Sequence, residues 1–118
     1  MAREKKTMDQ VRASHILLKH TGSRNPVSRR TGHHIDLTKE QALAEIREIQ
    51  QSLTPENFGH IAKKRSDCGS FQAHGDLGFF GRGQMQKPFE QATFALQIGE
   101  ISGVVDTDSG VHLIHRTA

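Results

Sequence analysis

The 118-residue chain contains one cysteine, Cys68, and neither tryptophan nor tyrosine. A single cysteine excludes an internal disulfide, and this low usage fits a reducing compartment. Long apolar runs are also missing near the N-terminus, where Ile16-Leu17-Leu18 is the longest among the first thirty residues. This run is too short for the core of a signal peptide or for a membrane span. We therefore expect a protein of the cytoplasm and nucleus that has no membrane partner.

Acidic residues are scarce in the first third of the chain, although the net charge of the whole is only +3. Residues 1–34 carry eight Lys/Arg and two acids, a net +6, whereas residues 35–118 carry a net −3. This asymmetry indicates a localised anion site, for nucleic acid or for a phosphorylated peptide. Residues 1–34 have no aromatic residue that could stack on bases. We therefore expect no nucleic-acid partner.

Hydrophobic periodicity and turn residues predict one α+β domain over residues 9–118, preceded by a disordered tail of residues 1–8. The expected order of elements is β–α–α–β–α–β–β, with a small antiparallel sheet. Apolar side chains on both faces of residues 11–20 place this strand inside the sheet. Further strands are expected at residues 77–80 and on both sides of the turn at 107–110.

Cap residues and prolines define the three expected helices. Thr38 as N-cap, with Gln41 three residues later, forms a capping-box pattern at the start of the first helix. Pro55 marks the first helical position of the second helix, and Pro88 that of the third. Gly99 is expected to end the third helix.

Three kinds of chemistry are open to Cys68, His15 and His112. Zinc is disfavoured because the sequence has no CxxC or HxxxH pair, and we expect no metal and no other cofactor. A cysteine nucleophile with a histidine base would also need an oxyanion hole, which nothing in the sequence specifies. A small buried side chain is the simpler interpretation of Cys68.

The third possibility is isomerisation of an X–Pro bond, which needs neither a nucleophile nor a cofactor. The barrier to rotation is about 18–20 kcal/mol, and each 1.4 kcal/mol or so removed gives roughly a tenfold increase in rate. Such a site needs an apolar pocket, polar side chains near the amide and an anchor for the preceding residue. The chain offers all three, but without further evidence ordinary core and a solvated basic loop are the favoured interpretation of the same side chains.

Four segments of the chain carry a family resemblance: VRASHILLKH, FGHIAKKRSDC, GDLGFFGRGQMQKPFEQATFAL and GEISGVVDTDSGVHLIHRT. Taken in order, from about Val11 to Thr117, they resemble the parvulin family of peptidyl-prolyl cis/trans isomerases. The resemblance is to the branch specific for phosphoserine- or phosphothreonine-proline bonds. It implies a four-stranded antiparallel sheet surrounded by three to four helices, and noncovalent catalysis through a twisted amide.

The resemblance also implies a role for each matching residue. The catalytic set would be His15, Cys68, His112, Ser109, Thr107 and Gln86, and the proline pocket would be Leu77, Met85 and Phe89. Lys19 and Arg24 would bind the substrate phosphate, with Arg29 and Arg30 as further candidates. The partners implied are proteins and peptides with phosphorylated Ser/Thr-Pro segments. We expect a monomer, because no apolar helix face is left over for a partner. Two alternatives stay open: a module that binds such segments without turnover, and a nucleic-acid binder that uses the basic N-terminal third.

Three departures from the family pattern bear on these expectations. Arg24 is followed by Asn25, where the branch often carries a second arginine, so the preference for phosphate could be milder. Gly69 stands where relatives usually have serine, and we expect a small effect. Because the sequence has no tryptophan, we expect the stand-alone catalytic form, without the WW module that some relatives fuse to this domain.

Overall fold

The computed structural model describes residues 9–118, so the tail expected at residues 1–8 lies outside the described residues. Its elements follow in this order: β1 (Gln10–Leu18), α1 (Lys39–Ser52), α2 (Phe58–Arg65), a 3-10 helix η1 (Gly69–Ala73), β2 (Asp76–Gly81), α3 (Lys87–Ala95), β3 (Val105–Thr107) and β4 (Gly110–Arg116). The predicted α+β class and order of strands and α-helices are confirmed. The 3-10 helix was not predicted.

The four strands form one antiparallel sheet in the order β2-β1-β4-β3. Strand β1 is therefore internal, as its two apolar faces predicted. In the β1–β4 ladder, His15 lies opposite Ile114 and Leu17 lies opposite His112. Directly opposed residues share a face of the sheet, so this register places His15 and His112 as diagonal neighbours on one face.

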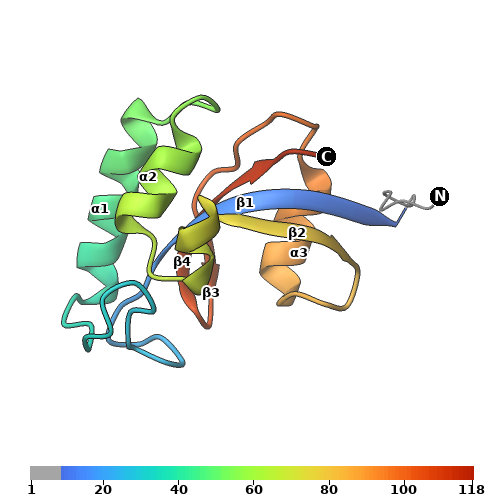
Figure 1. Ribbon diagram of the computed structural model, residues 1–118. Coiled ribbons are helices and arrows are strands. Elements are labelled where there is room, and N and C mark those ends of the chain that lie inside the picture. The colour runs from blue at the N-terminus through green and yellow to red at the C-terminus, as the bar shows by residue number, and fades with distance from the viewer. Residues whose placement is uncertain (1–8) are drawn as a thin grey trace.

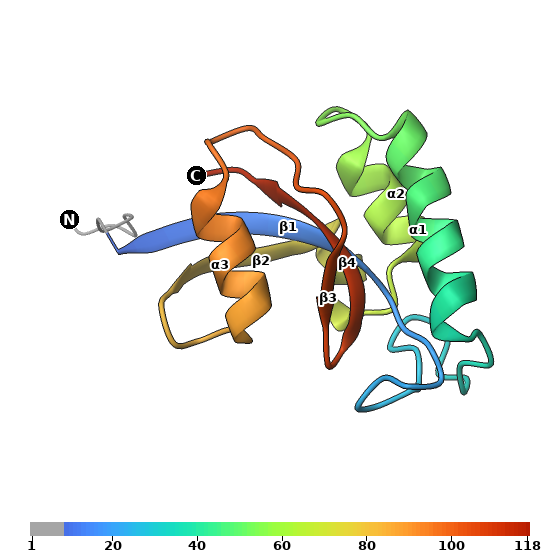
Figure 2. The same cartoon turned by 180° about the vertical axis from the view of Figure 1, so that it is seen from behind.

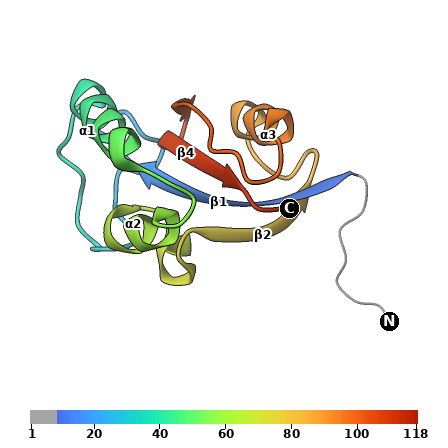
Figure 3. The same ribbon diagram turned by 90° about the horizontal axis from the view of Figure 1, so that it is seen from above.

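Helices cover both faces of the sheet (Figures 1 and 3). Helices α1 and α2 lie together on one side, and α3 lies on the other, as the view from behind also shows (Figure 2). The α1/α2 side buries one apolar cluster: Ile16, Leu18, Ala42, Ile46, Phe58, Ala62, Val111 and Leu113. The α3 side buries a second one: Val11, Ala13, Phe80, Phe89, Leu96 and Ile114. The two clusters follow from the alternation of strand side chains.

Helix α1 begins where its cap residues predict. The N–H of Gln41 donates to Oγ1 of Thr38 (3.1 Å), and the N–H of Thr38 donates to Oε1 of Gln41 (2.9 Å). Ala42 and Ile46 are its buried residues. Within residues 9–118, every helix is too short or too polar to cross a membrane.

Two predicted helix boundaries are wrong. Helix α2 begins at Phe58 rather than Pro55, and residues 55–57 form a turn instead. Thr54 and Asn57 exchange side-chain hydrogen bonds across this turn (2.8 and 3.2 Å). Helix α3 ends at Ala95 rather than near Gly99. There the next residue, Leu96, turns extended and is buried, and its carbonyl accepts from Nη1 of Arg116 (2.7 Å).

Candidate active site

A stacked pair of histidines lies on the α3 face of the sheet. Nδ1 of His15 and Nδ1 of His112 are 3.1 Å apart, and the rings stack at 23°. The ring of Phe89 meets both imidazoles edge-on, at centroid distances of 5.4 and 5.1 Å. Both histidines are at least 95% buried. Burial lowers the pKa of His15 to about 4. Burial and the neighbouring His15 lower the pKa of His112 well below its usual value. The pair is therefore uncharged at neutral pH.

A chain of hydrogen bonds joins this pair to the β3–β4 turn. Oγ1 of Thr107 lies 2.7 Å from Nε2 of His112, and the N–H of Ser109 donates to the same Oγ1 (3.1 Å). The turn can approach β1 closely because residue 110 is glycine. A Cβ on Gly110 would lie 2.5 Å from the carbonyl oxygen of Leu18. The histidines thus connect through Thr107 to a half-buried Ser109.

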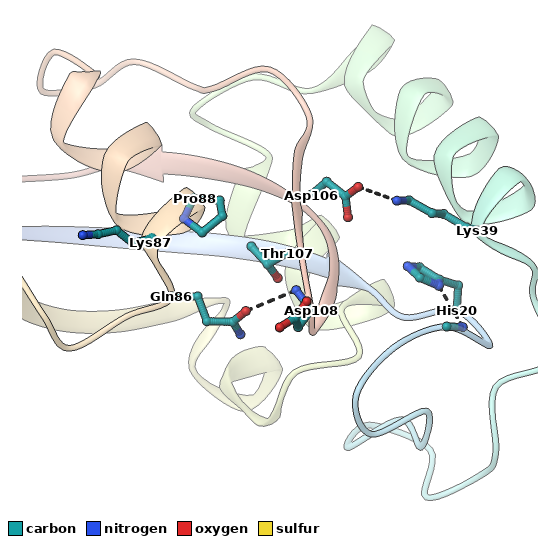
Figure 4. A pocket seen from close by; sticks show the side chains of 9 residues that line it. His20, Lys39, Gln86, Lys87, Pro88, Asp106, Thr107 and Asp108 are labelled. Carbon is teal, nitrogen blue, oxygen red and sulfur yellow. Dashed lines mark hydrogen bonds and ion pairs between the residues drawn. The ribbon is translucent and has the colours of Figure 1, made fainter.

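Gln86, the N-cap of α3, contacts the same turn with both ends of its amide. Nε2 of Gln86 donates to Oγ of Ser109 (2.7 Å). The side-chain oxygen Oε1 of Gln86 accepts from the backbone N–H of Asp108 (3.2 Å), as Figure 4 shows. A cavity of about 550 Å³ adjoins this contact, and its lining includes Gln86, His20 and Lys39. Gln86 therefore fixes the start of α3 against the β3–β4 turn.

The three apolar residues expected to hold proline come from different elements but meet in one cluster. Leu77 lies on β2, Met85 precedes α3, and Phe89 lies in its first turn. Phe89 belongs to the buried cluster on this face, and Leu77 and Met85 are partly buried against it. Leu77 and Met85 therefore keep part of their apolar surface accessible at the edge of this cluster.

A second cavity, of about 430 Å³, brings together most of the remaining expected residues. Its lining combines apolar, polar and cationic side chains: Leu17, Lys19, Arg24, Asn25, Arg29, Cys68, Gly69, Ser70, Leu77 and Ser109. We call it the substrate cavity, after the role expected of the residues that line it. Cys68 caps η1 and is half-buried on its wall. Gly69 has open space where a Cβ would lie, which fits the small effect expected of its departure from serine.

The cations of the basic loop, residues 19–38, fall into two groups: three line the substrate cavity, and one faces Asp67. Lys19, Arg24 and Arg29 line the substrate cavity. Nζ of Lys19 also donates to the carbonyl of Val27 (2.7 Å), and burial is the main cause that lowers the pKa of Lys19. Arg30 is not brought to this cavity. Its guanidinium faces Asp67, with Nη2 3.9 Å from Oδ1.

Asp67 is the residue of this region to which sequence reasoning gave no role. Its side chain is 1% exposed and accepts hydrogen bonds from three parts of the chain. The only signal in the sequence was an acid beside Cys68, two residues after the basic run Lys63-Lys64-Arg65. Among residues 9–118, no three His, Cys, Asp or Glu side chains are grouped as metal ligands.

Known proteins resemble this chain in sequence and in architecture. The PPIC-type PPIASE domain family matches residues 1–118. A protein of Arabidopsis thaliana named peptidyl-prolyl cis-trans isomerase Pin1 is 51% identical over 115 residues, which span 93% of this chain and 97% of the plant protein. The Theileria annulata peptidyl-prolyl cis-trans isomerase NIMA-interacting 1 is 51% identical over 116 residues, 94% of this chain and 82% of that protein.

Solved structures agree. The solution structure of TbPIN1 superposes with a TM-score of 0.84 at 50% identity, over 95% of this chain and 100% of that one. The peptidyl-prolyl isomerase ESS1 of Candida albicans gives a TM-score of 0.87 at 41% identity, and the alignment covers 93% of this chain and 63% of that one. With the family match, these similarities show that the chain belongs to the parvulin, or PPIC-type, family and is a peptidyl-prolyl cis/trans isomerase.

Proposed function

We propose that the chain isomerises phosphoserine-proline and phosphothreonine-proline bonds in proteins. The observation that carries this proposal is the lining of the substrate cavity, where Lys19, Arg24 and Arg29 stand beside Leu77, Cys68 and Ser109. A cationic rim next to an apolar patch matches a substrate that carries an anion on one side of the bond and a proline ring on the other. We expect a monomer acting on such proteins in the cytoplasm and nucleus.

The charge of the cavity suits a phosphoryl group. Phosphorylation brings about −1.5 to −2 charges and three acceptor oxygens. An arginine fork can donate two hydrogen bonds to them at once. Arg24 and Arg29 are exposed at the cavity, and Arg29 supplies a second guanidinium where Asn25 follows Arg24. Arg29 can thereby compensate for the departure at Asn25.

The mechanism we propose is noncovalent. The phosphate contacts would fix the residue before proline, and Leu77, Met85 and Phe89 would fix the ring. The intervening carbonyl would then rotate past Cys68, Ser109 and Gln86. Polar groups that fit the twisted amide better than either planar isomer lower the barrier. The neutral histidine pair would orient Thr107 and Ser109, and it would not transfer protons.

A comparison of matched peptides tests this function. Exchange NMR would measure cis/trans interconversion of a Ser-Pro peptide and of its phosphorylated form. Two charge-assisted hydrogen bonds of at least 1.5 kcal/mol each predict a preference of roughly 100-fold for the phosphorylated form. Equal acceleration of both peptides would refute phosphate specificity. Phosphopeptide binding with no acceleration would identify a recognition module.

A further inference from the structure

Asp67 lies at the junction of the basic loop, β1 and α2. Its Oδ2 accepts from the backbone N–H of Lys19 (3.0 Å), and its Oδ1 accepts from the hydroxyl of Ser28 (2.8 Å). Nη1 of Arg65, at the end of α2, donates to both oxygens (3.3 and 3.2 Å). The carboxylate is thus surrounded by donors from both ends of the loop segment 19–28 and from a helix.

The backbone of Asp67 adds two more links. Its N–H donates to the carbonyl of Leu17 on β1 (2.7 Å), and its own carbonyl accepts from the N–H of Arg29 (2.9 Å). Leu17, Lys19 and Arg29 all line the substrate cavity, and so does Cys68, the residue that follows Asp67. Asp67 therefore fixes the main chain at Lys19 and at Arg29, the two cations that its hydrogen bonds reach.

We infer that Asp67 is a positioning residue that sets selectivity for the phosphate by holding Lys19 and Arg29 at the cavity. The inference rests on the proposed function, since it concerns how the same cavity recognises its anion. The inference also separates Arg65 and Arg30, which face Asp67, from Lys19, Arg24 and Arg29, which line the cavity. Arg65 and Arg30 lie 3.2 and 3.9 Å from the carboxylate and offset its charge, so they are not free to meet a substrate.

Only an ionised carboxylate suits this position. Its oxygens are acceptors alone, and they can take about four hydrogen bonds between them. The donors gathered here need all of that capacity. An asparagine would keep the shape, but its amide N–H₂ would have to face either the N–H of Lys19 or the hydroxyl and guanidinium on the other side. One anchor of the loop would then be lost.

This argument predicts the opposite sign from a purely electrostatic one. If Asp67 acted only through its charge, replacing it with a neutral residue would make the cavity more positive and would tighten phosphate binding. If Asp67 positions the cations, the same replacement weakens binding. The sign of the change therefore separates the two roles.

The first experiment measures the kinetics of Asp67→Asn on phosphoSer-Pro and Ser-Pro peptides. We expect KM for the phosphopeptide to rise about tenfold, the size of one lost hydrogen bond to a charged group, with a much smaller change in kcat. The kcat/KM on the unmodified peptide should fall at least five times less. A lower KM for the phosphopeptide, or equal losses on both peptides, would overturn the inference.

A second pair of variants keeps the test available if Asp67→Asn does not fold. Ser28→Ala removes one donor to Asp67 and is expected to lower the phosphate preference about threefold. Ser102→Ala is the matched control. Its hydroxyl is also buried and hydrogen-bonded, but its partners are the backbone of Ile114 and Gly103 and not Asp67. Both changes should cost similar stability, and only Ser28→Ala should alter the preference.

The outcomes distinguish this inference from the proposed function. A wild-type chain with no phosphate preference would refute both. A wild-type preference that Arg24→Ala abolishes and that neither Asp67→Asn nor Ser28→Ala alters would keep the function and reject the role of Asp67.

Discussion

His15 and His112 approach each other through identical atoms, with 3.1 Å between the two Nδ1 positions. At this distance one imidazole donates a hydrogen and the other accepts it. If both rings were protonated, two N–H groups and two positive charges would face each other in a buried site. The geometry thus agrees with the lowered pKa of each ring.

This pair makes stability depend on pH in a defined window. The pKa of His15 is about 4 in the folded chain and about 6.5 in an unfolded one. As pH falls from 6.5 to 4, the unfolded chain takes up a proton that the folded chain does not. The free energy of unfolding therefore falls as pH drops through the window and is fully restored above it. At about 1.4 kcal/mol per pH unit, His15 accounts for roughly 3 kcal/mol.

Urea unfolding at pH 7.5, 5.5 and 4.5 measures this dependence. The His15→Asn variant is the control and should lose a large part of it. An NMR titration in which His15 gains its proton near pH 6.5 in the folded state would contradict the prediction.

Thr107→Val should remove the hydrogen bonds that join the histidine pair to the β3–β4 turn, because valine has nearly the same shape as threonine but no hydroxyl. The hydroxyl lies 2.7 Å from His112 and accepts from the N–H of Ser109, so valine leaves both groups without this partner. We expect kcat to fall about tenfold and stability to fall by about 1–2 kcal/mol. Thr93→Val is a buried control, since its hydroxyl donates to the Phe89 carbonyl within its own helix. Equal kinetic losses in both variants would argue against the hydrogen-bond chain.

The two neighbouring arginines of the basic loop should behave differently. Arg29 lines the substrate cavity, whereas Arg30 faces Asp67. Arg29→Gln is therefore expected to lower kcat/KM about tenfold on a phosphoSer-Pro peptide and much less on a Glu-Pro peptide. Arg30→Gln is the matched comparison. It should change the ratio of kcat/KM on the phosphoSer-Pro peptide to kcat/KM on the Glu-Pro peptide by less than threefold. A larger loss of selectivity from Arg30→Gln than from Arg29→Gln would reverse our assignment.

Cys68→Asp tests whether a bond to sulfur is required. Cys68 is half-buried at the cavity wall, where its sulfur accepts from the N–H of Ser70 (3.5 Å). In a noncovalent mechanism an aspartate still presents polar oxygens to the rotating amide, so we expect activity within about 100-fold of wild type. A rate equal to that of the uncatalysed peptide would favour a nucleophilic cysteine. Circular dichroism would confirm that the variant is folded.

Gly75→Ala should be one of the most damaging small substitutions. A Cβ at this position would lie 2.6 Å from the carbonyl oxygen of His15 and 2.9 Å from Cβ of Ala62, at a φ of +87°. We expect a loss of about 2–4 kcal/mol in stability. Gly103→Ala is the control, because nothing lies within 4 Å of the Cβ it would add. Thermal unfolding compares the two, and similar Tm values would contradict the prediction.

Local patterns predicted the elements well where a side chain acts within its own element. The Thr38–Gln41 capping box and the two apolar faces of β1 are examples, and both are confirmed. The helix ends failed where distant residues decide them. The end of α3 depends on Arg116, twenty residues beyond Leu96, whose carbonyl it binds. No local signal contains that contact.

The candidate site shows the same division. The family resemblance named six residues that line the substrate cavity, but it could not separate Arg29 from Arg30. Their directions depend on Asp67, which lies 37 residues beyond Arg30 in the chain. The role of Asp67 itself follows from donors that only the folded chain brings together.

The two hydrogen bonds of the Gln86 side chain limit how α3 and the β3–β4 turn can move relative to each other. Its amide links the start of α3, which carries Phe89, to both Asp108 and Ser109. Outward movement of α3 would break both hydrogen bonds at once. We therefore expect the start of α3 and the β3–β4 turn to move together. A mutation that moves the start of α3 would then also displace the hydroxyl of Ser109. The two surfaces must therefore evolve together for as long as Gln86 is kept.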